Sequence, residues 1–550
     1  MKAKVMIIAA TMLMANAAPS LACTDLLVGK KASVDGSVFV SYSCDGFGGF
    51  GTLFHQPRGK HQAGDQAMLM GFGSGSRGNR SIPQVAETYN VVGNMNEYQL
   101  TITESTFDGR LELVNREGLF DYASLMYLTL ARTKTAREAI KTMTDLVAEY
   151  GYNSTGESFF ICDPNEAWIM EMIGKGPDKK GAVWVAVRIP DDCISAHANQ
   201  SRIHKFALND PQNCLYAPDV ISLAREKGYF SGKDEDFSFS KAYNPIDFSG
   251  RRFCEARVWS FYNRYTDMGD QYLKYVLGET DEPMPLYVKP NRKLSVQDVK
   301  DAMRDHYEGT PLDPSKDLSA GPYHTPYRPV PLTYEVDGQT YFNERLTGTP
   351  QSAWVFVAQM RSWLPNAIGG VNWWGTDDAT MTIFVPLYCC LDVVPDCFRS
   401  GTGGANSRSF SWDSSFWVNN WIANMVYPRY SLMIDDVKAV QHDIESGYNN
   451  AQAGIEEVAA SLMKTDEAQA CAFLTNYSNT AAQMYMDTWK QLGEYLVVKY
   501  NDMVVQRMDN SRFVSRSIST EGYVNRPGIP ADFAKEMTKI TGDRYKQPAE

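Results

Sequence analysis

A cysteine placed directly behind an export signal is the feature that most constrains this chain. Residues 1–22 contain the basic Lys2 and Lys4, an apolar run over 5–14, and the small-x-small sequence Ser20-Leu21-Ala22, which are the three parts of a secretory signal peptide. Removal of residues 1–22 makes Cys23 the first residue of an exported protein, either periplasmic or extracellular. A membrane-spanning helix needs a run of about 18 or more apolar residues. No later stretch of the sequence contains such a run, so the sequence predicts no membrane span.

The residues after Cys23 predict a β-hairpin. The segments "TDLLVGK" and "SVFVSY" are rich in strand-forming residues, and Asp35-Gly36 lies between them. An Asp-Gly pair between two such segments is a strong hairpin signal. We therefore expect Cys23 at the head of the first of two antiparallel strands.

The rest of the chain alternates strands and helices, which predicts an α+β fold. A helical pattern covers 121–150, where Thr135 and Glu138 indicate an N-terminal capping box and Gly151 the end. Further predicted elements are three strands within 158–190, an Asp-Gly hairpin over 332–342 and a buried strand over 380–394. We expect a catalytic domain over 23–411, a helical extension over 412–508 that packs on it, and a polar tail over 509–550.

Composition excludes some functions. The chain of 550 residues is 44% hydrophobic and 21% charged, with a formal net charge of −12. A nucleic-acid-binding protein needs a basic face, so we expect no nucleic-acid partner. Ten cysteines are scattered along the chain, and their number leaves the disulfide pairing open. Adjacent Cys389 and Cys390 are interpreted as buried strand residues rather than as a vicinal disulfide.

A cysteine at the first position of a chain can combine two chemical roles. Its α-amine has an ordinary pKa of about 7.7–8.0, against about 8.5 for the thiol. The amine can therefore take the thiol proton near neutral pH, directly or through one water, and the sulfur can then attack a carbonyl group. Terminal threonine nucleophiles work in the same way, with the side chain as nucleophile and the α-amine as base.

Other catalytic patterns find little support. The sequence has no H-E-x-x-H, C-x-x-C or G-x-S-x-G motif. His197 and His204 lie seven residues apart, and polar or packing roles are favoured over metal binding for both. We expect neither a metal nor an organic cofactor.

Several segments together resemble one known family, the C69 dipeptidases. These segments are "CTDLLVGKKASVDGSVFVSYSCDG", "GNMNEYQLTITEST", "ESFFICDPNEAWIMEMIGKGP", "VWVAVRIPDDCISAHANQSRI", "EARVWS" and "IGGVNWWGTDDATMTIFVPLY". The C69 dipeptidases are N-terminal nucleophile (Ntn) hydrolases related to penicillin V acylases and bile-salt hydrolases. The resemblance implies a four-layer αββα sandwich and hydrolysis of small peptides, mainly dipeptides, through a thioester acyl-enzyme.

The resemblance also implies roles for individual residues. Cys23 matches the family nucleophile, and Asp45 matches a carboxylate that helps to hold the terminal amine. Asn199 matches the asparagine of the oxyanion site, and Arg257 matches a guanidinium near the nucleophile. Simpler roles stay open for three of them: a turn for Asp45, a loop contact for Asn199 and a surface ion pair with Glu255 for Arg257.

Two further residues concern the substrate and the charge balance. Because a dipeptidase must recognise a free ammonium group, Glu104 in "LTITEST" is a hypothetical ammonium-binding residue; an exposed strand glutamate is the alternative. The related acylases have an arginine three residues before the aspartate, where this chain has Tyr42. The charge balance around Cys23 should therefore differ, which favours a dipeptidase over an acylase.

Alternative functions remain open at this point. Cys23 could be lipidated, although the usual lipobox leucine three residues earlier is replaced by Ser20. The protein would then be a surface lipoprotein that binds peptides or glycans. An amidase or acylase of the penicillin V acylase type is a second alternative. The aromatic residues after 412 are expected to pack between helices, where they cover the sandwich or form a homo-oligomer contact.

Overall fold

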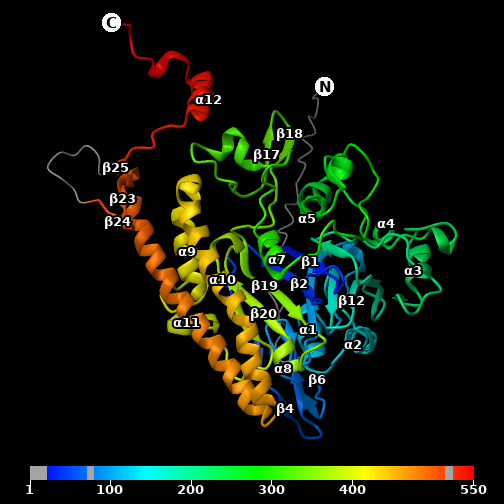
Figure 1. Ribbon diagram of the computed structural model, residues 1–550. Coiled ribbons are helices and arrows are strands. Elements are labelled where there is room, and N and C mark those ends of the chain that lie inside the picture. Colours follow the sequence, from blue (N-terminus) through cyan, green and yellow to red (C-terminus); the bar gives the residue numbers. More distant parts are fainter. Residues whose placement is uncertain (1–21, 71–79, 515–523, 550) are drawn as a thin grey trace, which may run out of the picture.

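The computed structural model describes residues 22–70, 80–514 and 524–549. Two antiparallel sheets dominate the fold (Figure 1). The first sheet has the strand order β16-β14-β1-β2-β19-β20-β21. Its strands are β16 Tyr287–Val288, β14 Ile194–His197, β1 Ala22–Val28, β2 Val38–Asp45, β19 Ser352–Met360, β20 Val371–Thr376 and β21 Val385–Tyr388.

The second sheet contains eight strands in the order β15-β13-β12-β11-β10-β9-β8-β3. Its strands are β15 Cys214–Tyr216, β13 Ala182–Ile189, β12 Ala167–Gly174, β11 Gly156–Cys162, β10 Thr101–Asp108, β9 Met95–Asn96, β8 Val91–Val92 and β3 His55–Gln56. The three strands predicted within 158–190 are thereby confirmed as β11, β12 and β13. The small hairpin of β17 Thr333–Val336 and β18 Gln339–Phe342 confirms the predicted Asp-Gly turn.

The two sheets pack face to face, because β1 and β2 contact β10 and β2 also contacts β11. Alternate residues of β11 point to opposite sides. Phe160 belongs to the core between the sheets, whereas Phe159 and Ile161 belong to a second core with the helices α1 and α2. Burial on both faces explains why these strands have continuous apolar sequences rather than an alternating pattern.

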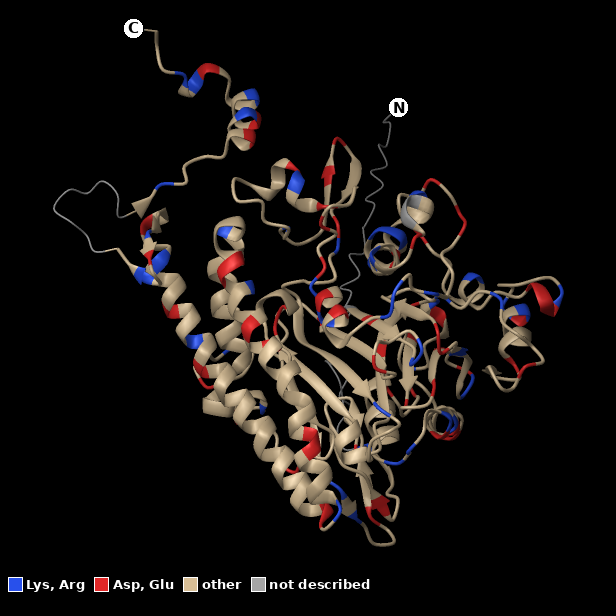
Figure 2. Ribbon diagram, viewed as in Figure 1, with Lys and Arg blue, Asp and Glu red and all other residues tan. Residues whose placement is uncertain are grey.

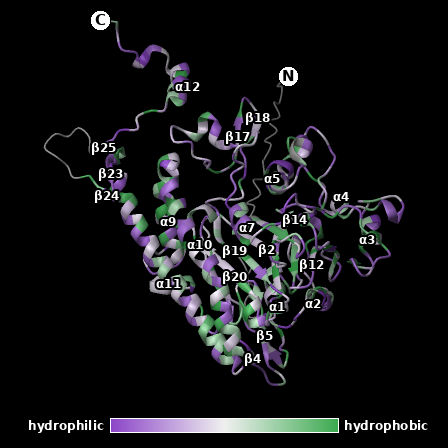
Figure 3. Cartoon of the chain, in the orientation of Figure 1, coloured by the Kyte–Doolittle hydropathy of each residue, from purple (hydrophilic) through white to green (hydrophobic). Residues whose placement is uncertain are grey.

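Helices contact both sheets from outside the interface between them. α1 Tyr122–Leu130 and α2 Ala136–Tyr150 contact the second sheet, while α7 Val296–Met303, α9 Ser415–Val426, α10 Tyr430–Met463 and α11 Glu467–Lys499 contact the first. Figure 1 shows α10 and α11 as a long antiparallel pair along one side of the molecule. Basic and acidic residues are interspersed along this pair (Figure 2), and hydrophobic residues line its inner faces and the strands (Figure 3).

The remaining helices lie in the connections and in the tail. They are α3 Val220–Glu226, α4 Phe239–Tyr243, a π-helix over Gly250–Glu255, α5 Ala256–Tyr265, α6 Leu273–Val276, α8 Asn366–Gly369 and α12 Ala531–Thr541. Within the described part of the chain, no helix is long and apolar enough to cross a membrane.

Local predictions were mostly accurate, with corrections at the ends of elements. The helical region 121–150 is two helices, and the Thr135 side chain caps α2 by accepting from the Glu138 N–H. The Glu138 carboxylate accepts from the Lys134 N–H and not from Thr135, so the capping box is incomplete. The strand expected over 380–394 is wrong in extent, because β21 covers only 385–388 and a 3₁₀ turn precedes it. All ten cysteines are free thiols, and Cys389 and Cys390 are buried.

Candidate active site

Cys23 lies near the beginning of β1, which pairs with β2 in the predicted hairpin. The register places Cys23 opposite Cys44 and Ala22 opposite Asp45. The connection includes Gly36, whose φ of 89° is easily adopted only by glycine. The hairpin that the sequence predicted therefore places Cys23 in a central strand, facing the second sheet.

Each polar atom of Cys23 contacts a different side chain. Its backbone nitrogen donates to Asn199 Oδ1 at 3.0 Å, and its carbonyl oxygen accepts from Arg257 Nη1 at 2.7 Å. Its thiol lies 3.5 Å from Glu104 Oε1 and 3.6 Å from the Tyr42 hydroxyl. The structure thus brings together, around one buried cysteine, three of the residues singled out in the sequence.

Asn199 connects the beginning of β1 to β10. It lies two residues beyond β14 with a φ of 62°, a left-handed conformation that asparagine tolerates better than most residues. Its backbone nitrogen donates to Ser105 Oγ at 3.2 Å, and its side-chain Nδ2 donates to the Thr106 carbonyl at 2.8 Å. The side chain therefore presents its oxygen to Cys23, while its N–H group is bound to β10.

Arg257 binds both the beginning of β1 and the Asn199 side chain. It is the second residue of α5, directly after the π-helix, and is 1% exposed. Besides Cys23, its guanidinium contacts Thr24 Oγ1 at 2.7 Å and Asn199 Oδ1 at 3.0 Å. The suggested surface pair with Glu255 is wrong, because Glu255 is bound to Arg202 at 3.0 Å.

Asp45 is buried at the end of β2 and is bound to distant residues. Its Oδ2 lies 3.1 Å from Arg345 Nη2, and its Oδ1 accepts from Ser352 Oγ at 2.7 Å. Burial raises the pKa of Asp45, although Arg345 and Ser352 oppose this shift. The turn role is wrong for Asp45, which is a strand residue. Its carboxylate has no hydrogen bond to Cys23 among the described contacts.

Tyr42 occupies the position where the related acylases have arginine. Its hydroxyl donates to Glu104 Oε1 at 2.8 Å beside the Cys23 sulfur. The guanidinium near Asp45 comes instead from Arg345, which the sequence reasoning missed because it lies 300 residues further along the chain. The sequence contains no local pattern around Arg345 that could have indicated this contact.

Glu104 is buried against Cys23, so its interpretation as an exposed strand residue is wrong. Its exposed fraction is 0%, and burial raises its pKa from 4.5 to about 7. Burial also raises the pKa of the Cys23 thiol well above its usual value, with further contributions from Cys44 and Glu104. In the chain that still carries Ala22, the sulfur is therefore a neutral thiol at neutral pH.

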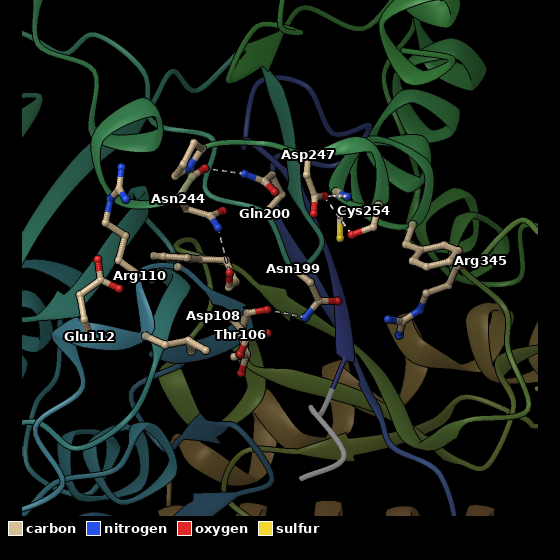
Figure 4. Close-up of a pocket in the computed structure, with 17 residues that line it drawn as sticks. Thr106, Asp108, Arg110, Glu112, Asn199, Gln200, Asn244, Asp247, Cys254 and Arg345 are labelled. Carbon is tan, nitrogen blue, oxygen red and sulfur yellow. Dashed lines mark hydrogen bonds between the residues drawn. The ribbon is translucent and has the colours of Figure 1, made fainter. Parts of the chain in front are cut away.

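A polar cavity of about 620 Å³ lies beside this cluster (Figure 4). Asn199, Thr106 and Arg345 belong to both the cavity wall and the surroundings of Cys23 or Asp45. Figure 4 shows the Asn199 side chain directed toward Thr106 on this wall. Cys23 itself does not line the cavity, whereas Asn199, which accepts from the Cys23 nitrogen, does.

The two histidines examined as metal ligands have other partners. His197 is buried and lies 2.6 Å from Ser105 Oγ, and His204 lies 3.3 Å from Ser238 Oγ. Among residues 22–70, 80–514 and 524–549, no group of three or more histidine, cysteine or acidic residues is arranged to hold a metal ion.

Comparison with known proteins gives the class of this chain. The model of peptidase family C69 matches residues 22–63 and 73–443. A "Probable dipeptidase" of Latilactobacillus sakei is 26% identical over 499 residues, which cover 87% of this chain and 95% of that protein. "Dipeptidase A" of Lactobacillus helveticus is 26% identical over 433 residues, or 74% of this chain and 82% of that protein.

A "Probable dipeptidase" of Salmonella dublin is also 26% identical, over 393 residues that cover 67% of this chain and 81% of that protein. The chain is therefore a hydrolase of the peptidase class. More specifically, it belongs to peptidase family C69, which confirms the resemblance recognised in the sequence segments.

Proposed function

We propose that this protein is an exported dipeptidase whose nucleophile is created when residues 1–22 are removed. The observation that carries this proposal is the environment of Cys23, whose nitrogen, carbonyl oxygen and sulfur each contact a separate polar side chain. A cysteine with only a packing role does not need such partners. The relatives named as dipeptidases support dipeptides as the substrates.

Removal of the leader would change the chemistry of the site. The Cys23 nitrogen, now a peptide N–H, becomes an α-amine with an ordinary pKa of about 7.7–8.0. This amine takes the proton from the thiol, and the sulfur attacks the carbonyl carbon of the substrate. The C–N bond then breaks, the leaving amine receives the proton, and water hydrolyses the thioester to release the first amino acid.

The surrounding residues have separate roles in this proposal. Asn199 holds the amine through Oδ1, and Arg257 fixes the Cys23 backbone. If Asn199 also serves the oxyanion, its Nδ2 must leave the Thr106 carbonyl. Asp45, bound to Arg345, stabilises the end of β2 opposite the cleavage point. Glu104, next to the sulfur, binds the free ammonium group of the substrate. No step requires a metal or an organic cofactor.

The fold and location belong to the same proposal. Two facing sheets with helices on both sides support the proposal of a four-layer αββα sandwich of the Ntn-hydrolase type. We assign the catalytic domain to 23–411, the packed helical extension to 412–508 and the tail to 509–550.

We place the mature protein in the periplasm or outside the cell. A homo-oligomer that forms through the helical extension is compatible with these domain bounds.

The proposal is tested by the mass of the mature N-terminal peptide together with one pair of variants. We expect a chain that begins at Cys23 with an unmodified amine and sulfur. Cys23→Ala should abolish dipeptide hydrolysis, whereas Cys162→Ala, which changes another buried free cysteine on β11, should remain active. A diacylglyceryl adduct on Cys23 contradicts the proposal and supports a lipoprotein. Faster cleavage of penicillin V than of dipeptides supports an acylase.

A further inference from the structure

A second buried carboxylate lies next to Glu104. Glu157 on β11 is 1% exposed, and the register places it directly opposite Thr106 of β10. Glu104 is two residues before Thr106, so that its side chain lies on the same face of the sheet. The two residues are therefore diagonal neighbours on paired strands, and Glu104 in turn contacts the Cys23 sulfur.

In each of the two carboxyl groups, one oxygen accepts a hydrogen bond and the other has no donor. Glu104 Oε1 accepts from Tyr42, and Glu157 Oε1 accepts from Thr106 at 3.0 Å. The remaining oxygens, Glu104 Oε2 and Glu157 Oε2, have no hydrogen-bond donor in the described part of the chain. Neither carboxylate has an ion pair with a lysine or arginine among these residues. Two adjacent buried carboxylates without a cation cannot both be ionised.

A substrate of the proposed reaction supplies the missing cation. In a dipeptide, the ammonium nitrogen is separated from the carbonyl carbon under attack by only one carbon atom. When the Cys23 sulfur attacks that carbon, the ammonium group must therefore lie within a few ångströms of the sulfur, where Glu104 lies. Glu104 and Glu157 do not themselves line the cavity, but Thr106, whose hydroxyl donates to Glu157, does.

We propose that Glu157 and Glu104 together bind the α-ammonium group of the substrate, so that Glu157 restricts the enzyme to peptides with a free N-terminus. The ammonium group donates to the unoccupied oxygens of the two carboxyl groups. This inference rests on the proposed dipeptidase function and adds a specificity-determining residue to it. N-acylated peptides, which lack the positive charge, leave both carboxyl groups without a partner and are rejected.

The test compares alanyl-alanine with N-acetyl-alanyl-alanine in wild-type enzyme and in Glu157→Gln. Glutamine keeps the shape of the side chain and an oxygen for Thr106 but removes the charge. We expect the variant to lose about 10- to 100-fold in kcat/KM for alanyl-alanine, mainly through KM, because a charge-assisted hydrogen bond is lost. The value for the acetylated peptide should not fall. Equal losses on both peptides, or no loss on either, overturn the inference.

Two carboxylates that line the cavity, Glu112 and Asp108, serve as controls. Glu112 lines the same cavity and is bound to the Tyr229 hydroxyl, so Glu112→Gln removes one negative charge without touching the pair. The Glu112→Gln variant should leave the preference between the two peptides unchanged.

Asp108 lies further along β10 on the cavity wall. A selective loss for alanyl-alanine in Asp108→Asn, and not in Glu157→Gln, overturns the inference by placing the ammonium group elsewhere.

A measurement on the wild-type enzyme keeps the inference testable if Glu157→Gln does not fold. Butylamine carries an ammonium group without a carbonyl, and 1-butanol has a similar shape without the charge. We expect competitive inhibition of alanyl-alanine hydrolysis by butylamine and not by 1-butanol. Equal inhibition by both compounds, or by neither, contradicts an ammonium site.

The failure of this inference can be distinguished from failure of the proposed function. Hydrolysis of alanyl-alanine by Cys23→Ala, or its absence in the processed wild-type enzyme, contradicts the dipeptidase mechanism and, with it, the inference. Hydrolysis that requires Cys23 but shows no selective effect of Glu157→Gln contradicts only the ammonium site.

Discussion

Arg345 Nη2 lies 3.1 Å from Asp45 Oδ2, although 300 residues separate the two along the chain. Both side chains are largely removed from solvent. Asp45 ends the strand that pairs with the beginning of β1, and Arg345 also lines the cavity. This ion pair therefore links the wall of the cavity to the strand that pairs with β1.

Breaking the Arg345–Asp45 pair should strongly destabilise the protein. Arg345→Met leaves Asp45 buried without its cation, and we expect the free energy of unfolding to fall by about 3–5 kcal/mol. The double variant Asp45→Asn/Arg345→Met should lose less than the sum of the two single variants, because neither charge then remains unpaired. Urea unfolding measures the unfolding free energy of the two single variants and of the double variant. If the losses of the single variants add up to the loss of the double variant, a direct ion pair is contradicted.

Stability should depend on pH through Glu104. Its pKa is raised from 4.5 to about 7 by burial, so the folded state binds this proton more tightly than the unfolded state. The stabilising contribution is complete below pH 4.5 and is lost as the pH rises toward 7. Compared with Glu104→Gln, which does not titrate, wild-type protein should lose about 3 kcal/mol of unfolding free energy over this interval. Parallel pH profiles of the two proteins contradict the raised pKa.

Arg257 should not be replaceable by lysine. Its guanidinium contacts Cys23, Thr24 and Asn199 at the same time, whereas a lysine ammonium cannot reproduce this planar geometry. We expect Arg257→Lys to reduce kcat/KM and to lower the unfolding free energy by about 2–4 kcal/mol. Arg58→Lys is the matched control, because Arg58 pairs with Glu97 at the surface and should change stability by less than about 1 kcal/mol. Similar behaviour of both variants contradicts the assigned role.

The roles of Oδ1 and Nδ2 of Asn199 can be tested separately by substitution. Asn199→Asp keeps an oxygen for the Cys23 nitrogen and tolerates the left-handed backbone, but it removes the N–H group. If Nδ2 serves the oxyanion during the reaction, kcat should fall about 100- to 1,000-fold, as measured by steady-state hydrolysis of a dipeptide. Wild-type kcat in this variant would restrict Asn199 to holding the amine.

Short-range patterns were sufficient for much of this protein. The Asp-Gly turns, the apolar runs of β11 to β13 and the cap at Thr135 depend on neighbouring residues, and the structure confirms them. Segment resemblance likewise led to the correct family and to residues that contact one another around Cys23. These predictions succeeded because turns, caps and apolar runs involve residues close in sequence.

The surroundings of Cys23 were decided only by the tertiary structure. Arg345 and Glu157 carry no motif, and their importance depends on how the two sheets pack and which side chains this packing buries. Burial then sets the electrostatics, since a carboxyl group removed from water without a cation binds its proton more tightly. The sequence determined that a cysteine heads the first strand of the hairpin, and the contact between the sheets determined which charged groups surround it.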